Sequence, residues 1–119
     1  MNEKRYIIIL HPDGLNETHE VPESGPTLKE LQKAVGGRIE TVPSVLSNGW
    51  TKEPGARVIL VINEEGKLNG LPINHAATDL SWLRCDHIAG SAVLCATKGE
   101  EIIGFSREAA LNIRKRRKL

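Results

Sequence analysis

Residues 58–78, VILVINEEGKLNGLPINHAAT, decide the fold that we predict for this chain. The stretch opens with five apolar residues, 58–62, and a short β-branched run closed by turn residues is typical of a buried strand. Residues 63–66 carry the turn signal, and residues 67–71 are predicted to return as the second arm of a hairpin. Polar side chains therefore gather at the end of a rigid strand, where both binding sites and plain turns occur.

Four other segments have strand patterns. Residues 5–10 are apolar at almost every position, so we expect a central strand that is covered on both faces. Residues 16–22 alternate weakly and contain charges and Pro22, which suit a strand at the edge of a sheet. Further strands are predicted at residues 38–42 and 88–96, and loops at residues 44–56 and 98–101.

Helix signals occur at three places. Thr27 and Glu30 form a capping-box pattern, and Gly36 stands where a left-handed C-cap is expected. Asn74 and Ser106 have the residue types that cap helix N-termini. The predicted helices cover residues 28–35, 74–83 and 107–113.

Length and composition point to one domain. The 119 residues suffice for one core, and 39% hydrophobic with 26% charged residues is ordinary for a soluble globular protein. Strands and helices mix without regular β-α-β alternation. We therefore predict an α+β fold: a single domain with a mostly antiparallel, twisted sheet and two or three helices packed mainly on one face.

The sequence lacks the usual marks of a membrane or secreted protein. No apolar run approaches the roughly 20 residues that a membrane-spanning helix needs. Residues 6–10 are too short for the hydrophobic core of a signal peptide, and charged residues follow closely. We therefore expect a cytoplasmic protein without a membrane partner, in which Cys85 and Cys95 are reduced thiols.

The C-terminal residues 114–119 differ in composition from the rest of the chain. They carry five basic residues, so the net charge of +1 for the whole chain leaves −4 for residues 1–113. We treat residues 1–113 as the domain and residues 114–119 as a basic tail. Such a tail is either solvated, because cations near a helix C-terminus are favourable without a partner, or it contacts nucleic-acid phosphates. The alternative nucleic-acid site consists of Arg114, Lys115, Arg116, Arg117 and Lys118.

Candidate ligand-binding residues lie in and around the predicted turns. The turn at residues 63–67 presents carboxylates and an ammonium to a ligand, or it is a solvated loop. Asn74 either caps a helix or binds a polar heterocycle. Gly37 and Arg38 have the amide and guanidinium that hold phosphate, although they follow a helix C-terminus, which repels anions. The candidate ligand-binding set is Gly37, Arg38, Glu40, Asn63, Glu64, Lys67, Asn69, Asn74 and Thr78.

Three groups of residues have catalytic or metal-binding types, and none has a recognisable pattern. His75, Cys85, His87 and Cys95 lack the tight spacing of zinc sites. Adjacent side chains in residues 85–87 diverge if the segment is extended, which argues against a Cys-His nucleophile there. Glu40 and Glu64 form a carboxylate pair only if the fold brings them together. We therefore predict no catalytic residue, metal or cofactor.

Four segments recur together in an order that resembles a known family: residues 35–42 (VGGRIETV), 61–74 (VINEEGKLNGLPIN), 77–78 and 88–90. The family is small, known only as a domain of unknown function, and occurs in bacteriophages and mobile elements. The likeness covers about residues 28–105 and implies a viral or plasmid origin without supplying an activity. Family members usually have a bulky aromatic residue in place of Arg38, and the loop at residues 48–50 is longer here.

These observations predict a non-enzymatic binding protein of phage or mobile-element origin with a pocket for a small polar or nucleotide-like ligand. One concrete version is a sponge that sequesters a nucleotide-derived host defence signal. The alternative is an interaction protein that modulates a host or phage complex and contacts nucleic acid through its basic tail. In both versions the protein acts in the host cytoplasm, and a homo-oligomer fits a chain this short, which often builds its pocket at an interface.

Overall fold

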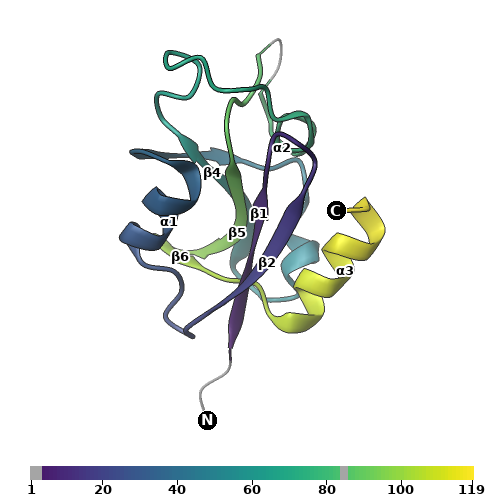
Figure 1. Ribbon diagram of the computed structural model, residues 1–119. Helices are drawn as coiled ribbons and strands as arrows, with labels where there is room; N and C mark the ends of the chain where they lie inside the picture. The colour runs from purple at the N-terminus through teal and green to yellow at the C-terminus, as the bar shows by residue number, and fades with distance from the viewer. Residues whose placement is uncertain (1–3, 84–85) are drawn as a thin grey trace.

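The computed structural model describes residues 4–83 and 86–119. Within these residues, six strands form one antiparallel sheet in the order β2-β1-β5-β4-β3, with β6 paired to β5 (Figure 1). The strands are β1 (Arg5–Leu10), β2 (Asn16–Val21), β3 (Ile39–Pro43), β4 (Ala56–Asn63), β5 (Ala92–Lys98) and β6 (Glu101–Ile103). The helices are α1 (Leu28–Val35), the 3-10 helix η1 (Asn48–Thr51), α2 (His75–Leu80) and α3 (Arg107–Arg117).

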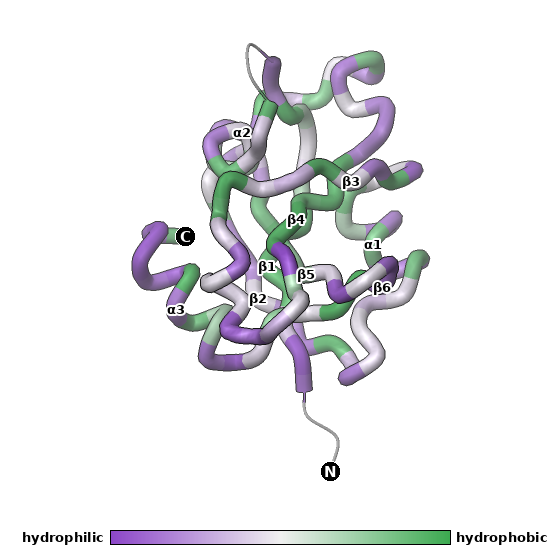
Figure 2. Tube along the Cα trace, turned by 180° about the vertical axis from the view of Figure 1, so that it is seen from behind, coloured by the Kyte–Doolittle hydropathy of each residue, from purple (hydrophilic) through white to green (hydrophobic). Residues whose placement is uncertain are grey.

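Both faces of the sheet are buried, because alternate residues of the central strands point to opposite sides. One face packs with α2 and α3, and the other packs with α1. Figure 2 shows the hydrophobic residues concentrated on the central strands. The α2/α3 face includes Ile8, Leu10, Leu60, Leu94, Phe105 and Ile113, and the α1 face includes Ile7, Ile9, Leu31, Val35, Val61 and Val93. The predicted α+β fold is therefore confirmed, with two of the three α-helices on one face.

The capping box of α1 forms as predicted. Thr27 Oγ1 accepts from the Glu30 amide at 3.1 Å, and the Glu30 carboxylate accepts from the Thr27 amide at 3.0 Å. At the other end, Gly36 adopts a left-handed conformation with φ of 80°. These local contacts explain why the bounds of α1 could be predicted from the sequence alone.

Replacing Thr27 by alanine is expected to lower the free energy of unfolding by about 1 kcal/mol, because the Glu30 amide loses its acceptor. Urea denaturation followed by circular dichroism measures this change. Lys29→Ala on the exposed face of α1 is the control and is expected to change stability by less than about 0.5 kcal/mol. Equal stability of the two variants would contradict a capping role for Thr27.

The predicted hairpin arm at residues 67–71 is wrong. This segment forms successive turns, in which the Asn69 amide donates to Glu65 and the Leu71 amide donates to Gly66. The reason is that β4 already pairs with β3 on one side and β5 on the other, so it has no free edge for a returning arm. Gly66 also packs closely against Ala89: a Cβ atom added at residue 66 would lie 2.4 Å from the Ala89 carbonyl oxygen.

The last long strand begins later than predicted. Residues 88–90 pair with residues 72–74 instead of joining the sheet: the Asn74 amide donates to Ile88, and the Gly90 amide donates to Pro72. Strand β5 starts at Ala92 and then turns back into β6, a short strand that the sequence analysis missed. The predicted loop at residues 44–56 contains η1, whose Trp50 packs against the core.

The basic C-terminal residues continue α3, which ends at Arg117. Arg114 folds back onto the start of β2: it donates to the Thr18 hydroxyl and, at 3.3 Å, to the Asn16 carbonyl. It also donates to the carbonyl of Leu119. No helix in the described part of the chain is long and apolar enough to cross a membrane.

Candidate functional site

A cleft of about 540 Å³ lies where β3 begins and β4 ends. We call it the β3–β4 cleft. Its apolar lining consists of Val42, Ile62, Leu68, Leu83, Ile88 and Ala89. Its polar lining consists of Glu40, Asn63, Glu64, Lys67, Asp86 and His87. Small-molecule sites combine apolar lining residues with polar groups that orient the ligand, and this cleft has both kinds in equal number.

Lys67 and Asp86 form an ion pair at the cleft, with 2.5 Å between Nζ and Oδ1. The hydrogen bond from Lys67 and, to a lesser degree, the His87 amide lower the pKa of the Asp86 carboxyl. Both side chains are nearly half-exposed, so water screens the pair and its contribution to stability is small. A polar ligand can therefore compete for either partner.

The cleft is acidic. Its lining contains three carboxylates, those of Glu40, Glu64 and Asp86, against the single ammonium of Lys67. Arg38 lies outside the lining and binds the acidic turn, at 3.5 Å from Glu64 and 3.1 Å from Glu65. This charge distribution favours ligand groups that are cationic or donate hydrogen bonds within the cleft.

Asn63 and Gly37 connect the β3–β4 cleft to the end of α1. The buried Asn63 amide donates to the Val35 carbonyl at 3.1 Å and accepts from the Glu65 amide at 2.8 Å, so it joins the end of α1 to the turn. Gly37 packs on this amide, and a Cβ atom at residue 37 would come within 2.9 Å of Asn63 Nδ2. Both residues therefore have structural roles.

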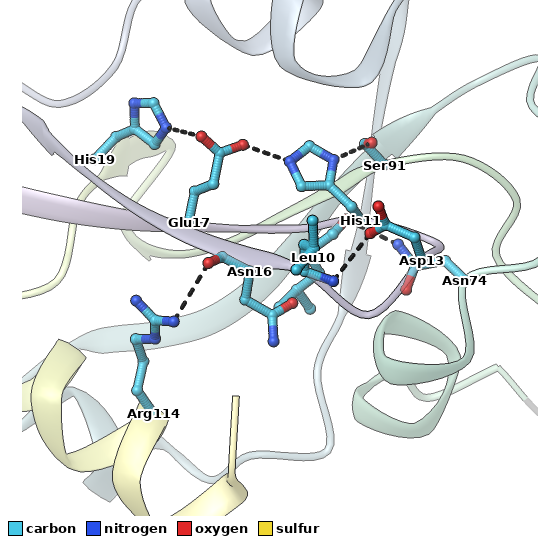
Figure 3. Close-up of polar contacts among 10 residues, drawn as sticks. Leu10, His11, Asp13, Asn16, Glu17, His19, Asn74, Ser91 and Arg114 are labelled. Atoms are coloured by element: carbon cyan, nitrogen blue, oxygen red, sulfur yellow. Dashed lines mark hydrogen bonds and ion pairs between the residues drawn. The ribbon is translucent and has the colours of Figure 1, made fainter.

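Asn74 and Thr78 also have structural contacts. Asn74 is fully buried, and its oxygen accepts from the Ala77 amide at the start of α2. Its Nδ2 donates to the carbonyl of Leu10 (Figure 3) and also to that of Gly90, at 2.9 Å each. Thr78 Oγ1 donates to Asn74 and accepts from the Ile88 amide, which fixes one wall of the β3–β4 cleft.

The structure thus brings together four of the nine predicted ligand residues, Glu40, Asn63, Glu64 and Lys67. Arg38 lies beside them, whereas Asn69 is exposed in the turn and outside the lining. Sequence reasoning considered Asp86 and His87 only as catalytic or metal-binding types and left them out of the ligand-binding set. The acidic residue beside a histidine was visible in the sequence, but its pairing with Lys67 spans 19 positions and has no local signal.

The cysteines and histidines that were considered as metal ligands do not form a metal site in the described part of the chain. Cys95 is fully buried in the sheet, and burial raises the pKa of its thiol to about 12, which makes it a poor nucleophile. Cys85, for which a reduced thiol was predicted, lies outside the described residues. Among the described residues, no three His, Cys, Asp or Glu side chains are arranged to hold a metal ion.

The family profile described as Domain of unknown function (DUF3846) matches residues 4–117. The chain belongs to the DUF3846 family. This match confirms the resemblance to a domain of unknown function and extends it over nearly the whole chain. No curated protein and no solved structure matches this DUF3846 chain. Every residue that lines the β3–β4 cleft lies within the matched range.

Proposed function

We propose that this DUF3846 protein is a binding protein that holds a small polar ligand in the β3–β4 cleft without converting it. The observation that supports this proposal is the composition of the cleft, whose lining combines apolar side chains with several charged ones. The half-exposed Lys67–Asp86 pair provides an ammonium and a carboxylate that can exchange partners when a ligand enters.

The charge of the cleft narrows the class of ligand. An isolated phosphate is repelled by three carboxylates, whereas a heterocycle with amino groups finds acceptors in Glu40 and Glu64. Phosphates attached to such a base would lie outside the cleft on the side of the exposed Arg38. In our concrete version, a phage or mobile element uses the protein to sequester a nucleotide-derived host defence signal.

Calorimetry with cyclic nucleotides and ADP-ribose-derived nucleotides tests this version. Replacing Lys67 by alanine is expected to weaken binding at least about tenfold, equivalent to about 1.4 kcal/mol, because a hydrogen-bond acceptor on the heterocycle loses its charged donor. Lys33→Ala on α1, outside the lining of the cleft, is the matched control and should bind as the wild type does. Failure of all these nucleotides to bind the wild type would overturn the sponge version.

A second candidate function is that of an interaction protein that modulates a host or phage complex and contacts nucleic acid through α3. The observation in its favour is a hollow of about 230 Å³ that joins Trp50 to Asn112 and Arg116 on the basic helix. The indole of Trp50 beside the guanidinium of Arg116 offers stacking to a base and charge to a phosphate. Lys115, Arg117 and Lys118 add exposed cations to the same helix end.

Electrophoretic mobility shifts test this candidate. Replacing Lys115, Arg117 and Lys118 by glutamine is expected to weaken binding to single-stranded DNA at least tenfold at low salt, because phosphate contacts dominate such affinity. Arg114 stays unchanged, since its contacts with β2 are structural. Lys4→Gln with Lys29→Gln and Lys33→Gln is the charge-matched control. If the wild type shifts neither DNA nor RNA at low salt, this candidate fails.

A further inference from the structure

Four polar side chains form a continuous hydrogen-bonded row across three neighbouring strands (Figure 3). His11 follows β1, Glu17 and His19 lie on β2, and Ser91 precedes β5. His11 Nδ1 lies 2.7 Å from Ser91 Oγ, and His11 Nε2 lies 2.5 Å from Glu17 Oε2. The other oxygen of Glu17 lies 3.2 Å from His19 Nε2.

The partners of His11 determine where its proton lies. Hydrogen bonds from His11 and His19 lower the pKa of the Glu17 carboxyl, so at neutral pH this group is ionised and can only accept. His11 Nε2 must then carry the proton that it donates to Glu17. In the neutral ring, Nδ1 is left as the acceptor, and the Ser91 hydroxyl donates to it.

This order of hydroxyl, imidazole and carboxylate is the arrangement that activates a serine nucleophile. The imidazole can remove the proton from Ser91, and the carboxylate holds the ring in the required tautomer. The three residues lie on or directly next to three different strands, so the arrangement depends on the fold and not on a local sequence motif.

The backbone behind the row is rigid. β1 lies between β2 and β5, and Leu10 pairs with Asn16 on one side and Ala92 on the other. The side-chain amide of Asn74 donates to two carbonyls, those of Leu10 and Gly90. These residues come immediately before His11 and Ser91. This amide therefore fixes the spacing between the base and the hydroxyl, as a preorganised site requires.

A hollow of about 610 Å³ is lined in part by His11 and Glu17, while the half-buried Ser91, which bonds the other ring nitrogen of His11, lies outside this lining. Pro12, Leu15 and Pro72 give it an apolar lining, and Leu15 is exposed. Asp13 and Glu17 make the same hollow unfavourable for an anionic substrate. An uncharged acyl compound with an apolar group fits both properties.

We propose that Ser91 is a nucleophile that transfers the acyl group of an uncharged ester to water. Ser91 Oγ attacks the ester carbonyl and forms a new carbon–oxygen bond while its proton passes to His11 Nδ1. The bond to the alcohol oxygen then breaks, and the proton on His11 passes to that leaving oxygen. A water molecule, deprotonated by His11, releases the acid and restores the Ser91 hydroxyl. Glu17 is a positioning residue that acts through His11.

This activity goes beyond ligand binding in the β3–β4 cleft, because it uses different residues and a different hollow. The two sites share the end of the sheet where β1 and β4 finish and β5 begins. Loss of nucleotide binding would leave the Ser91 proposal intact, and an unreactive Ser91 would leave the binding proposal intact.

Reaction of the full chain with p-nitrophenyl acetate tests the proposal. Release of p-nitrophenol is followed by absorbance, and the acetylated residue is identified by peptide mass spectrometry in the wild-type protein. We expect one acetyl group, located on Ser91. Ser91→Ala should remove this modification, whereas Ser24→Ala, at an exposed serine outside the row, should not change it.

Variants of His11 and Glu17 distinguish a role in the acetylation of Ser91 from a purely structural role. His11→Ala is expected to slow acetylation by about 100-fold or more, and added imidazole should restore part of the rate. Glu17→Gln should slow it as well, while Glu17→Asp keeps the carboxylate and should retain more of the rate. Absence of acetylation, acetylation at other residues in place of Ser91, or an unchanged rate in His11→Ala would overturn the proposal.

Discussion

Replacing Asn74 by alanine is expected to lower the free energy of unfolding by about 3–7 kcal/mol. The variant loses the N-cap of α2, a contact worth about 1 kcal/mol. It also leaves the carbonyls of Leu10 and Gly90 without this donor, and each unsatisfied buried group costs about 1–3 kcal/mol. Urea denaturation, with the slope compared between variants, measures the change.

Two further variants sharpen this measurement. Asn69→Ala is the matched control, because this asparagine is exposed in the turn, and its effect should stay within about 0.5 kcal/mol. Asn74→Asp keeps the oxygen that caps α2 but buries a carboxylate against the two carbonyl oxygens, so it should destabilise the protein more than Asn74→Ala does. An Asn74→Ala variant within 1 kcal/mol of the wild type would show that another group, such as water, replaces the amide.

Truncating Phe105 to alanine is expected to cost about 3–5 kcal/mol, because it opens a cavity in the α2/α3 face of the core. Phe105 is one of the largest fully buried side chains, and its backbone pairs with Tyr6 through two hydrogen bonds. These backbone bonds survive the substitution, so the loss reports on packing. Thermal and urea denaturation both measure it.

Leu111→Ala is the control for Phe105, since Leu111 on α3 is exposed. This substitution truncates a large apolar side chain on the surface and leaves the core intact. The free energy of unfolding should therefore change by less than about 0.5 kcal/mol. If Phe105→Ala lowers the free energy of unfolding by less than about 1 kcal/mol, the neighbouring core side chains must have moved into the space left by the ring.

The parts of the fold that depend on local contacts could be predicted from the sequence. The capping box of α1, the cap of α3 at Ser106 and the apolar strands β1 and β4 all have signals within a few residues. The errors concern the choice of strand partners. Residues 67–71 have no free strand to pair with, and β6 forms only because β5 offers an edge.

The candidate sites show the same division between local and distant contacts. Glu64 and Lys67 were identified because they share one turn with polar neighbours. The row of Ser91, His11 and Glu17 was missed, since its members are up to 80 positions apart and form no spaced motif. Their one visible signal is that His11 directly follows one apolar strand and Ser91 comes directly before another.

The contacts of Arg114 with β2 have a consequence for association between copies of the chain. β2 lies at one border of the sheet, where open backbone groups invite a strand from another molecule. The guanidinium occupies the Asn16 carbonyl and the Thr18 hydroxyl, so an incoming strand must first displace it. A basic side chain that the sequence assigned to a nucleic-acid site thus also hinders the addition of a strand at the start of this border.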